Sequence, residues 1–117
     1  MTAGELKART KTFSLRVIKL VNALPHSLAS QVIGKQLLRA ATSVGANYRA
    51  ACRAQSKSDF AAKISIVLEE ADESLYWLEL IGESGLIKAE RLKDLLREAN
   101  ELTAIVNASR KTAKGQR

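Results

Sequence analysis

The sequence predicts an all-α protein, an up-down-up-down, left-handed four-helix bundle. Aromatic residues make up 4% of the 117 residues, with only 6 glycines and 1 proline, whereas sheet proteins need more β-branched, aromatic and turn residues. Apolar residues recur at steps of three and four along four stretches, as in a helix with one buried face. Three short breaks separate the stretches, and helices joined by short connections pack most simply as antiparallel neighbours.

The first two predicted helices are divided at Pro25. Proline cannot continue a helix and pushes the preceding residue towards extended conformations, so the first helix should run from about Glu5 to Ala23. The second should start near Ser27 and run to about Ala54. Their apolar stripes define half of the expected core: Leu6, Phe13, Val17, Leu20, Val21 and Leu24, then Ile33, Leu37, Ala40, Ala41, Val44, Tyr48 and Ala51.

The third predicted helix begins after Ser56, which together with Asp59 resembles a capping box. Gly82 and Gly85 flank its end. The helix carries a second apolar set near its C-terminal end, more than contact with one neighbour requires, so we expect self-association there. The predicted subunit contacts are Tyr76, Trp77, Leu80 and Ile81.

The last predicted helix spans about Ala89 to Ser109 and buries a leucine-rich stripe. The sequence therefore predicts a single bundle domain over residues 1–109. Residues 110–117 are polar and basic, and we expect them to form a frayed tail.

The overall composition predicts a cytoplasmic protein that binds an anionic partner. The chain holds 19 Lys and Arg against 12 Asp and Glu, a net charge of +7, which suits nucleic acid, a membrane surface or an acidic protein. The one cysteine, Cys52, permits no intrachain disulfide and fits a reducing compartment. No apolar run approaches eighteen residues, so we expect no membrane span, and the N-terminus lacks an apolar signal core. No predicted helix pairs a basic face with an exposed apolar one, so we expect no membrane partner.

The antiparallel arrangement of the bundle predicts which charged residues lie at the same height. If the second and third helices are antiparallel about a turn near Gln55, Arg39 is level with Asp72 and Glu73. We expect a structural ion pair of Arg39 with these two acids, buried or half-buried, that fixes the register of the helices.

The end of the bundle that bears both termini should be strongly basic. By the same reasoning, eleven basic residues gather there against two acids, Glu5 and Asp59. Such a cluster favours phosphate binding, although a solvated basic face that only aids solubility is the alternative. The predicted nucleic-acid contacts are Arg49, Arg53, Lys57 and Lys63, with Arg9, Lys11, Arg110 and Lys111 as outer contacts.

The sequence gives little support to enzyme chemistry. His26 is the only histidine, and the Glu-x-x-His pairs of di-iron bundles and a phosphate-binding loop are both missing from the sequence. We therefore expect no catalytic residues, no metal and no cofactor. The rival hypothesis is a protein-interaction scaffold or accessory factor, for example for a reverse transcriptase, with no direct role for nucleic acid.

Two segments resemble the bacterial four helix bundle proteins of the 23S rRNA intervening-sequence protein family. They are residues 38–48, LRAATSVGANY, and the stretches SKSDF at 56–60 and EEADESLYWLEL at 69–80. The resemblance implies a left-handed bundle that assembles as a ring-like homopentamer, with no enzymatic activity. A related bundle is an accessory protein of diversity-generating retroelements that binds nucleic acid and a reverse transcriptase. Many family members have Glu three residues after the Asn of this motif, where this chain has Ala50.

Overall fold

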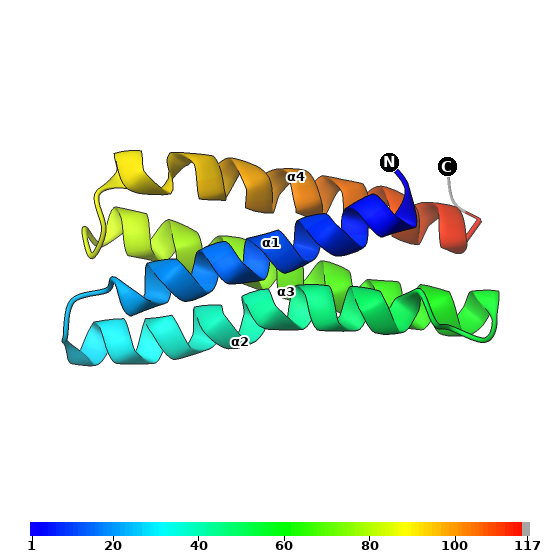
Figure 1. Ribbon diagram of the computed structural model, residues 1–117, viewed down its shortest axis with the longest axis horizontal. Coiled ribbons are helices and arrows are strands. Elements are labelled where there is room, and N and C mark those ends of the chain that lie inside the picture. Colours follow the sequence, from blue (N-terminus) through cyan, green and yellow to red (C-terminus); the bar gives the residue numbers. More distant parts are fainter. Residues whose placement is uncertain (116–117) are drawn as a thin grey trace.

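The computed structural model describes residues 1–115 and is a bundle of four antiparallel helices, as the sequence predicts (Figure 1). The helices are α1 (Ala3–Asn22), α2 (Leu28–Ala51), α3 (Lys57–Glu83) and α4 (Ala89–Ala113). The bundle measures 45 × 21 × 20 Å. The turn between α2 and α3 lies at the same end as both termini, and the other two turns lie at the opposite end.

Local sequence explains where the helices begin. The side chains of Thr2, Ser27 and Ser56 precede the first three helices and accept hydrogen bonds from backbone N–H groups three residues later, at 3.1, 3.1 and 3.0 Å. These bonds satisfy N–H groups that have no partner within the helix. The predicted cap at Ser56 is thus present, whereas Lys88 before α4 makes no side-chain cap.

Two helix ends differ from the prediction. Helix α2 ends at Ala51, three residues earlier than expected, because the chain turns before it reaches the Ser56 cap. Helix α4 continues to Ala113, four residues beyond Ser109, so residues 110–113 are helical rather than frayed. The last two residues of the predicted tail, 116 and 117, lie outside the described residues.

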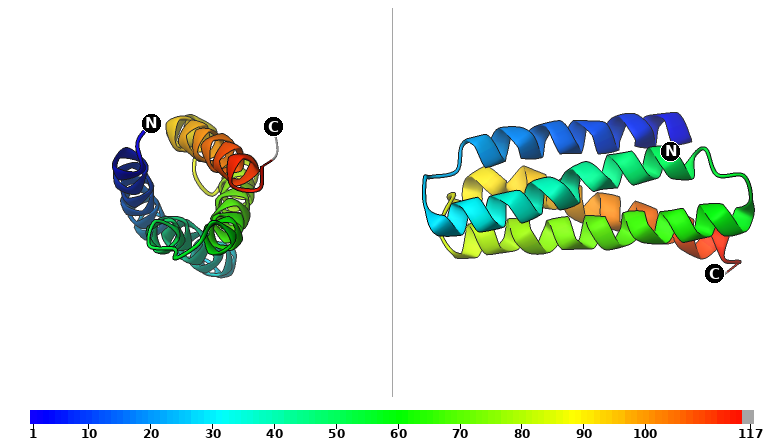
Figure 2. Two further views of the ribbon diagram at one scale, coloured as in Figure 1. Left: turned by 90° about the vertical axis from the view of Figure 1, so that its right-hand side faces the viewer. Right: turned by 90° about the horizontal axis from the view of Figure 1, so that it is seen from below.

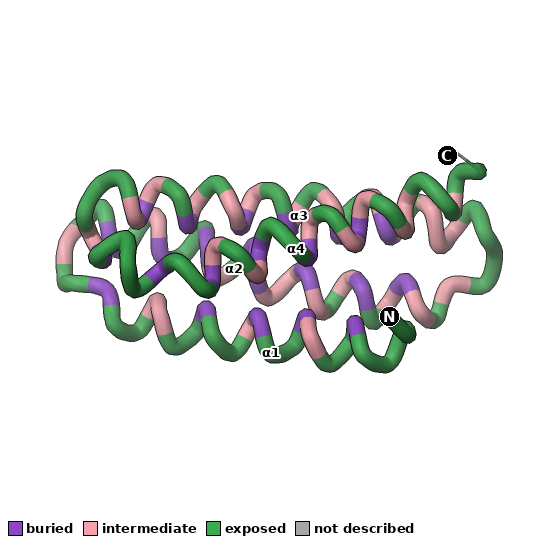
Figure 3. The backbone as a smooth tube through the Cα atoms, turned by 90° about the horizontal axis from the view of Figure 1, so that it is seen from above, coloured by how far each residue is buried: buried purple, intermediate pink, exposed green. Residues whose placement is uncertain are grey.

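The core lies where the four predicted stripes face one another. Buried residues recur on the inner side of every helix, and exposed residues cover the outer side (Figure 3). Phe13, Leu37, Leu78 and Leu102, one from each helix, are at most 1% exposed. Consecutive helices lie side by side, and the end-on view shows α1 and α4 as the two outer members of the row, curled towards each other (Figure 2).

Candidate nucleic-acid interface

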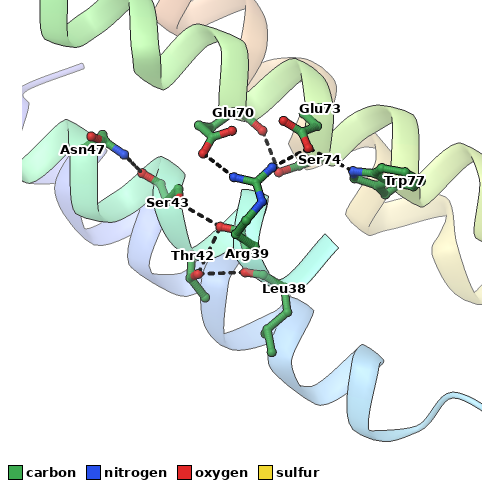
Figure 4. Close-up of polar contacts among 9 residues, drawn as sticks. All are labelled: Leu38, Arg39, Thr42, Ser43, Asn47, Glu70, Glu73, Ser74 and Trp77. Carbon is green, nitrogen blue, oxygen red and sulfur yellow. Dashed lines mark hydrogen bonds and ion pairs between the residues drawn. The ribbon is translucent and has the colours of Figure 1, made fainter. Parts of the chain in front are cut away.

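Arg39 on α2 is held by two carboxylates of α3 (Figure 4). Its Nη1 donates to Glu70 Oε2 at 2.9 Å, and its Nη2 donates to Glu73 Oε1. Glu73 is a predicted partner, but Asp72 is not a partner of Arg39, and Glu70 takes its place. The reason is helical rotation: residues three apart share a face, whereas Asp72 points away from α2 and lines a hollow with Asn100 and Asn107 of α4.

This ion pair also engages the one tryptophan. Trp77 Nε1 donates to Glu73 Oε1 at 3.3 Å. The Arg39 guanidinium, and to a smaller extent the indole N–H, lowers the pKa of Glu73 below its usual value. The side chain of Arg39 is 49% exposed, more exposed than the half-buried pair that we expected. Its role is nevertheless to tie α2 to α3.

Arg9 is bound to α4 and is not free for phosphate. Its Nε and Nη2 donate to the two carboxylate oxygens of Glu98 at 2.7 and 2.6 Å, and Nη2 also donates to Glu101 at 2.7 Å. This two-pronged geometry uses the planar fork of arginine, and it raises the pKa of Arg9 above its already high value. Arg9, predicted as an outer phosphate contact, is therefore engaged within the chain, and Glu98 and Glu101 add acids to a region that was expected to hold only Glu5 and Asp59.

Lys63 is also paired. Its Nζ donates to Asp59 Oδ1 at 2.7 Å, one helical turn away. The ammonium lowers the pKa of Asp59, whose other oxygen accepts a bond of 3.4 Å from the Gln55 backbone N–H. Lys63 was predicted as a principal phosphate contact, but much of its charge is balanced within α3.

Four cations line a cleft between α1 and α2 and form the candidate site. The cleft has a volume of about 500 Å³. Among the described residues, no ion pair within 4.0 Å involves these cations, in contrast to Arg9, Arg39 and Lys63. We call this set the α1/α2 basic cleft: Lys7, Lys11, Arg49 and Arg53.

Small residues form the rest of the cleft and let the two helices approach. They are Ala8, Ser14, Thr42, Gly45 and Ala46. A Cβ atom on Gly45 would lie 3.5 Å from the backbone of Thr10, so the helices are in van der Waals contact at that height. Ser14 Oγ donates across the same seam to the Ala41 carbonyl at 3.0 Å. The long basic side chains therefore flank a shallow cleft with a rigid floor.

The structure brings together only some of the predicted contacts. Arg49, Arg53 and Lys11 share the cleft, and Lys7 joins them. Lys7 was counted at the basic end but not assigned to the site, although its spacing of four residues from Lys11 places both on one face of α1.

The other three predicted contacts lie elsewhere. Lys57 lines a second hollow at the terminal end, of about 1220 Å³, with Phe60 and Ile105 among its apolar residues. Arg110 is half-buried on α4, and its Nε is buried without a hydrogen-bond partner among the described residues. Lys111 is exposed on α4. None of these three cations is among the residues that line the cleft.

The predicted subunit contacts also divide. Ile81 is fully buried in the chain's own core, so it cannot touch a second copy, and that assignment is wrong. Tyr76 is 54% exposed, whereas Trp77 and Leu80 are half-buried. Tyr76 packs edge-on against Trp77, with ring centroids 5.1 Å apart.

Two exposed residues of α2 extend this apolar face. The Arg39–Glu73 pair places these two residues at the same height on the antiparallel helices. Val32 is two turns before Arg39 and Leu80 is two turns after Glu73, so Val32 and Leu80 also lie at about the same height. Val32 is 53% exposed, and Leu28, one turn further out, is 78% exposed. We call this set the α2/α3 apolar face: Leu28, Val32, Tyr76, Trp77 and Leu80.

Residues 1–115 contain neither a cluster of possible metal ligands nor a helix that could span a membrane. No three His, Cys, Asp or Glu side chains come together there as a possible metal site. None of the helices in this range is both long enough and apolar enough to cross a bilayer.

Comparison with known proteins identifies relatives of the whole bundle. Residues 5–108 match the family model of the 23S rRNA-intervening sequence protein. A crystal structure of a protein of unknown function from the S23 ribosomal protein family of Bacteroides thetaiotaomicron VPI-5482 is 34% identical, with a TM-score of 0.87. The match covers 95% of this chain and 99% of that one. Comparison with curated proteins finds no significant match.

Proposed function

The chain belongs to the 23S rRNA-intervening sequence protein family, and we propose that it is a non-enzymatic, homo-oligomeric bundle that binds structured RNA or a ribonucleoprotein. The RNA is held through its phosphates, in the cytoplasm. The family is named for a 23S rRNA-intervening sequence, and the similar Bacteroides protein is assigned to the S23 ribosomal protein family, which supports an RNA partner.

The observation that carries this proposal is the contrast in how the cations are paired. Arg9, Arg39 and Lys63 have carboxylate partners within the chain, whereas the cations of the α1/α2 basic cleft have none among the described residues. Unpaired Lys and Arg release the counterions of a phosphate backbone when they bind it, and this release drives nucleic-acid association. Arginine adds a planar fork that grips phosphate with two hydrogen bonds.

Salt titration tests this function. Binding of a structured RNA, measured by fluorescence anisotropy, should weaken as salt rises, with a log–log slope of about −3 for the three to four phosphate contacts that the four cations of the cleft allow. The double variant Arg49→Ala/Arg53→Ala should weaken binding about tenfold or more for every RNA sequence tried, since the contacts are to the backbone. Binding that does not respond to salt would refute the proposal.

A matched control uses cations that are already engaged. Arg39→Ala removes one positive charge from α2, as the single variant Arg49→Ala does, but from a side chain that two carboxylates hold. It should leave RNA affinity nearly unchanged. An equal loss from Arg39→Ala would mean that only net charge matters and that the protein has no defined RNA site.

The homo-oligomer rests on the α2/α3 apolar face. Exposed side chains such as Tyr76 and Val32, grouped beside half-buried Trp77, are the composition expected of a protein interface. Light scattering should give a mass well above the 12.8 kDa of one chain, and a pentamer would match the family resemblance. The variant Val32→Glu/Tyr76→Glu should shift the mass towards the monomer, and a wild-type protein that is strictly monomeric would exclude the assembly.

The same apolar face supports the rival function, a scaffold for another protein. Co-purification separates the two functions. The scaffold is favoured if a nuclease-treated preparation retains one protein partner, keeps that partner at high salt and binds no RNA. An RNA that copurifies and is released by salt favours the primary proposal.

A further inference from the structure

We propose that the α1/α2 basic cleft holds three consecutive phosphates of one unpaired RNA strand, lying parallel to the helix axes. This inference rests on the proposed function and names the form of the ligand and the residues that bind it. The cleft is the ligand site, and the remaining cations of the basic end are not part of it.

The argument begins with the relative heights of the two helices. Gly45 faces Thr10, and Ser14 Oγ bonds to the Ala41 carbonyl, so these contacts fix the register of α1 against α2. Arg49 is one turn beyond Gly45, and Lys7 is about one turn before Thr10. Because the helices are antiparallel, Arg49 and Lys7 lie at the same height on opposite walls of the cleft.

The other two cations lie one turn away on either side. Arg53 follows Arg49 by four residues towards the terminal end, and Lys11 follows Lys7 by four residues towards the middle of the bundle. At a rise of 1.5 Å per residue, the four helical residues from Lys7 to Lys11 correspond to about 6 Å. Arg53 lies in the turn after α2, where its backbone N–H bonds to the Ala50 carbonyl, so the chain continues past Arg49 towards the terminal end. The cleft therefore presents positive charge at three heights: Arg53, then Arg49 with Lys7, then Lys11.

This spacing suits a polymer better than a single small anion. Neighbouring phosphates along an extended strand are separated by about one such step, so each height can meet one phosphate. Helical rotation keeps Lys7 and Lys11 on one face of α1, and Arg49 and Arg53 line the same cleft from the other side, so the three heights form a line rather than a scattered patch. A line of charge between two helices fits one backbone, whereas a duplex presents two backbones on opposite sides of its grooves.

Within residues 1–115, no carboxylate forms an ion pair with the cations of the cleft. Glu5 is the acid nearest to Lys7 in sequence, and its carboxylate accepts a hydrogen bond from the Thr2 hydroxyl. Asp59, beyond the turn from Arg53, is engaged by Lys63. The cations need not break an internal ion pair to bind phosphate.

Oligouridylates with one to five phosphates, labelled with a fluorophore, test the proposal by anisotropy on the intact full-length protein. Affinity should rise steeply up to three phosphates and change little beyond that. The log–log salt slope for the longer oligomers should be about −2, from three contacts at about 0.7 each for single strands. A steady rise in affinity through five phosphates, or a slope that grows with length, would overturn the three-phosphate cleft.

Variants assign the heights individually. Arg53→Ala should move the plateau from three phosphates to two and reduce the salt slope by about 0.7, whereas Arg53→Lys should preserve both. Circular dichroism melting should be the same for all three proteins, because Arg53 forms no ion pair that the fold depends on. An unchanged plateau with Arg53→Ala would overturn the assignment.

The controls separate this inference from the proposed function. Lys57→Ala and Lys111→Ala remove cations of the basic end outside the cleft and should leave oligouridylate binding unchanged. If they abolish binding while the cleft variants retain it, the protein binds RNA but not in this cleft. If neither oligouridylates nor structured RNA bind in a salt-dependent way, the proposed function itself fails.

Discussion

Two groups of arginines from one stretch of the chain have different surroundings. Arg39 lies in the middle of α2 and is held by Glu70 and Glu73 of α3. Arg49, in the last turn of α2, and Arg53, in the turn that follows, line the basic cleft without an ion pair among the described residues. The acids of α3 account for the difference, since the segment level with Arg49 and Arg53 contains only Asp59, which Lys63 engages. The distribution of acids on the neighbouring helix therefore decides which cations are structural and which are available to a ligand.

Reversing the charge of a paired cation should cause the largest loss of stability. Arg9→Glu would place a third carboxylate beside Glu98 and Glu101 and remove three charged hydrogen bonds that join α1 to α4. Loss of charged hydrogen bonds and new repulsion should lower the free energy of unfolding by about 2–4 kcal/mol. Urea denaturation followed by circular dichroism measures this loss.

Arg49→Glu is the matched reversal in the cleft. It should change the free energy of unfolding by less than about 0.5 kcal/mol, as expected for a surface substitution without a partner. Equal destabilisation by the two variants would show that Arg49 also supports the fold, which contradicts the division between paired and available cations.

Acid should weaken the paired group while leaving the cleft charged. The folded state holds the pKa of Glu73 below its usual value of 4.5 because the Arg39 guanidinium favours the carboxylate. Its contribution to stability is thus complete above about pH 4.5 and is lost as the pH falls through the lowered pKa. The melting temperature should fall in this acidic range, and it should fall less in Arg39→Ala.

Two readouts sharpen this test. Fluorescence of Trp77, whose N–H donates to Glu73, should follow the same acidic transition. RNA affinity should stay flat between about pH 5 and pH 8, since no His, Cys, Asp or Glu is among the described residues that line the cleft. A transition in affinity within that interval would implicate a titrating group that the cleft, as described, does not contain.

A modest gain in stability is expected at the floor of the cleft. Gly45→Ala should raise the free energy of unfolding by up to about 1 kcal/mol, because alanine favours a helix and its Cβ would lie at an ordinary contact distance of 3.5 Å from Thr10. The matched change Gly34→Ala should gain less, since its Cβ would lie 3.1 Å from Leu24 Cδ1. Thermal melting compares them, and a loss of stability in Gly45→Ala would mean that α1 and α2 tolerate no added volume there.

The heights of residues on consecutive helices could be predicted from the sequence, but the rotation of each helix about its axis could not. Apolar spacing located the four helices and the core, and the turn near Gln55 placed Arg39 level with Glu73. Height alone did not distinguish Asp72 from Glu70, because the choice depends on which way each side chain faces around α3. A more detailed helical-wheel argument would have separated them.

Contacts between α1 and α4 were harder to predict. Helices α1 and α4 are far apart in sequence, with three turns between them. Each turn adds uncertainty to the predicted height and rotation of α4 relative to α1. Arg9 therefore appeared to be an available cation, although Glu98 and Glu101 lie within hydrogen-bond distance of it. The cleft was partly predictable, since Arg49 with Arg53 and Lys7 with Lys11 are each four residues apart.

The N-terminus lies at the same end of the bundle as the α2–α3 turn and the basic cleft (Figure 1). An affinity tag there would lie near the cleft, and an acidic tag would compete with RNA for its cations. The turn around Gly85 is at the opposite end, its glycine has a φ of 78°, and nothing lies within 4 Å of the position where a Cβ would project. A tag or fluorophore inserted in that turn leaves the cleft unobstructed, which makes it the preferred attachment point for surface immobilisation.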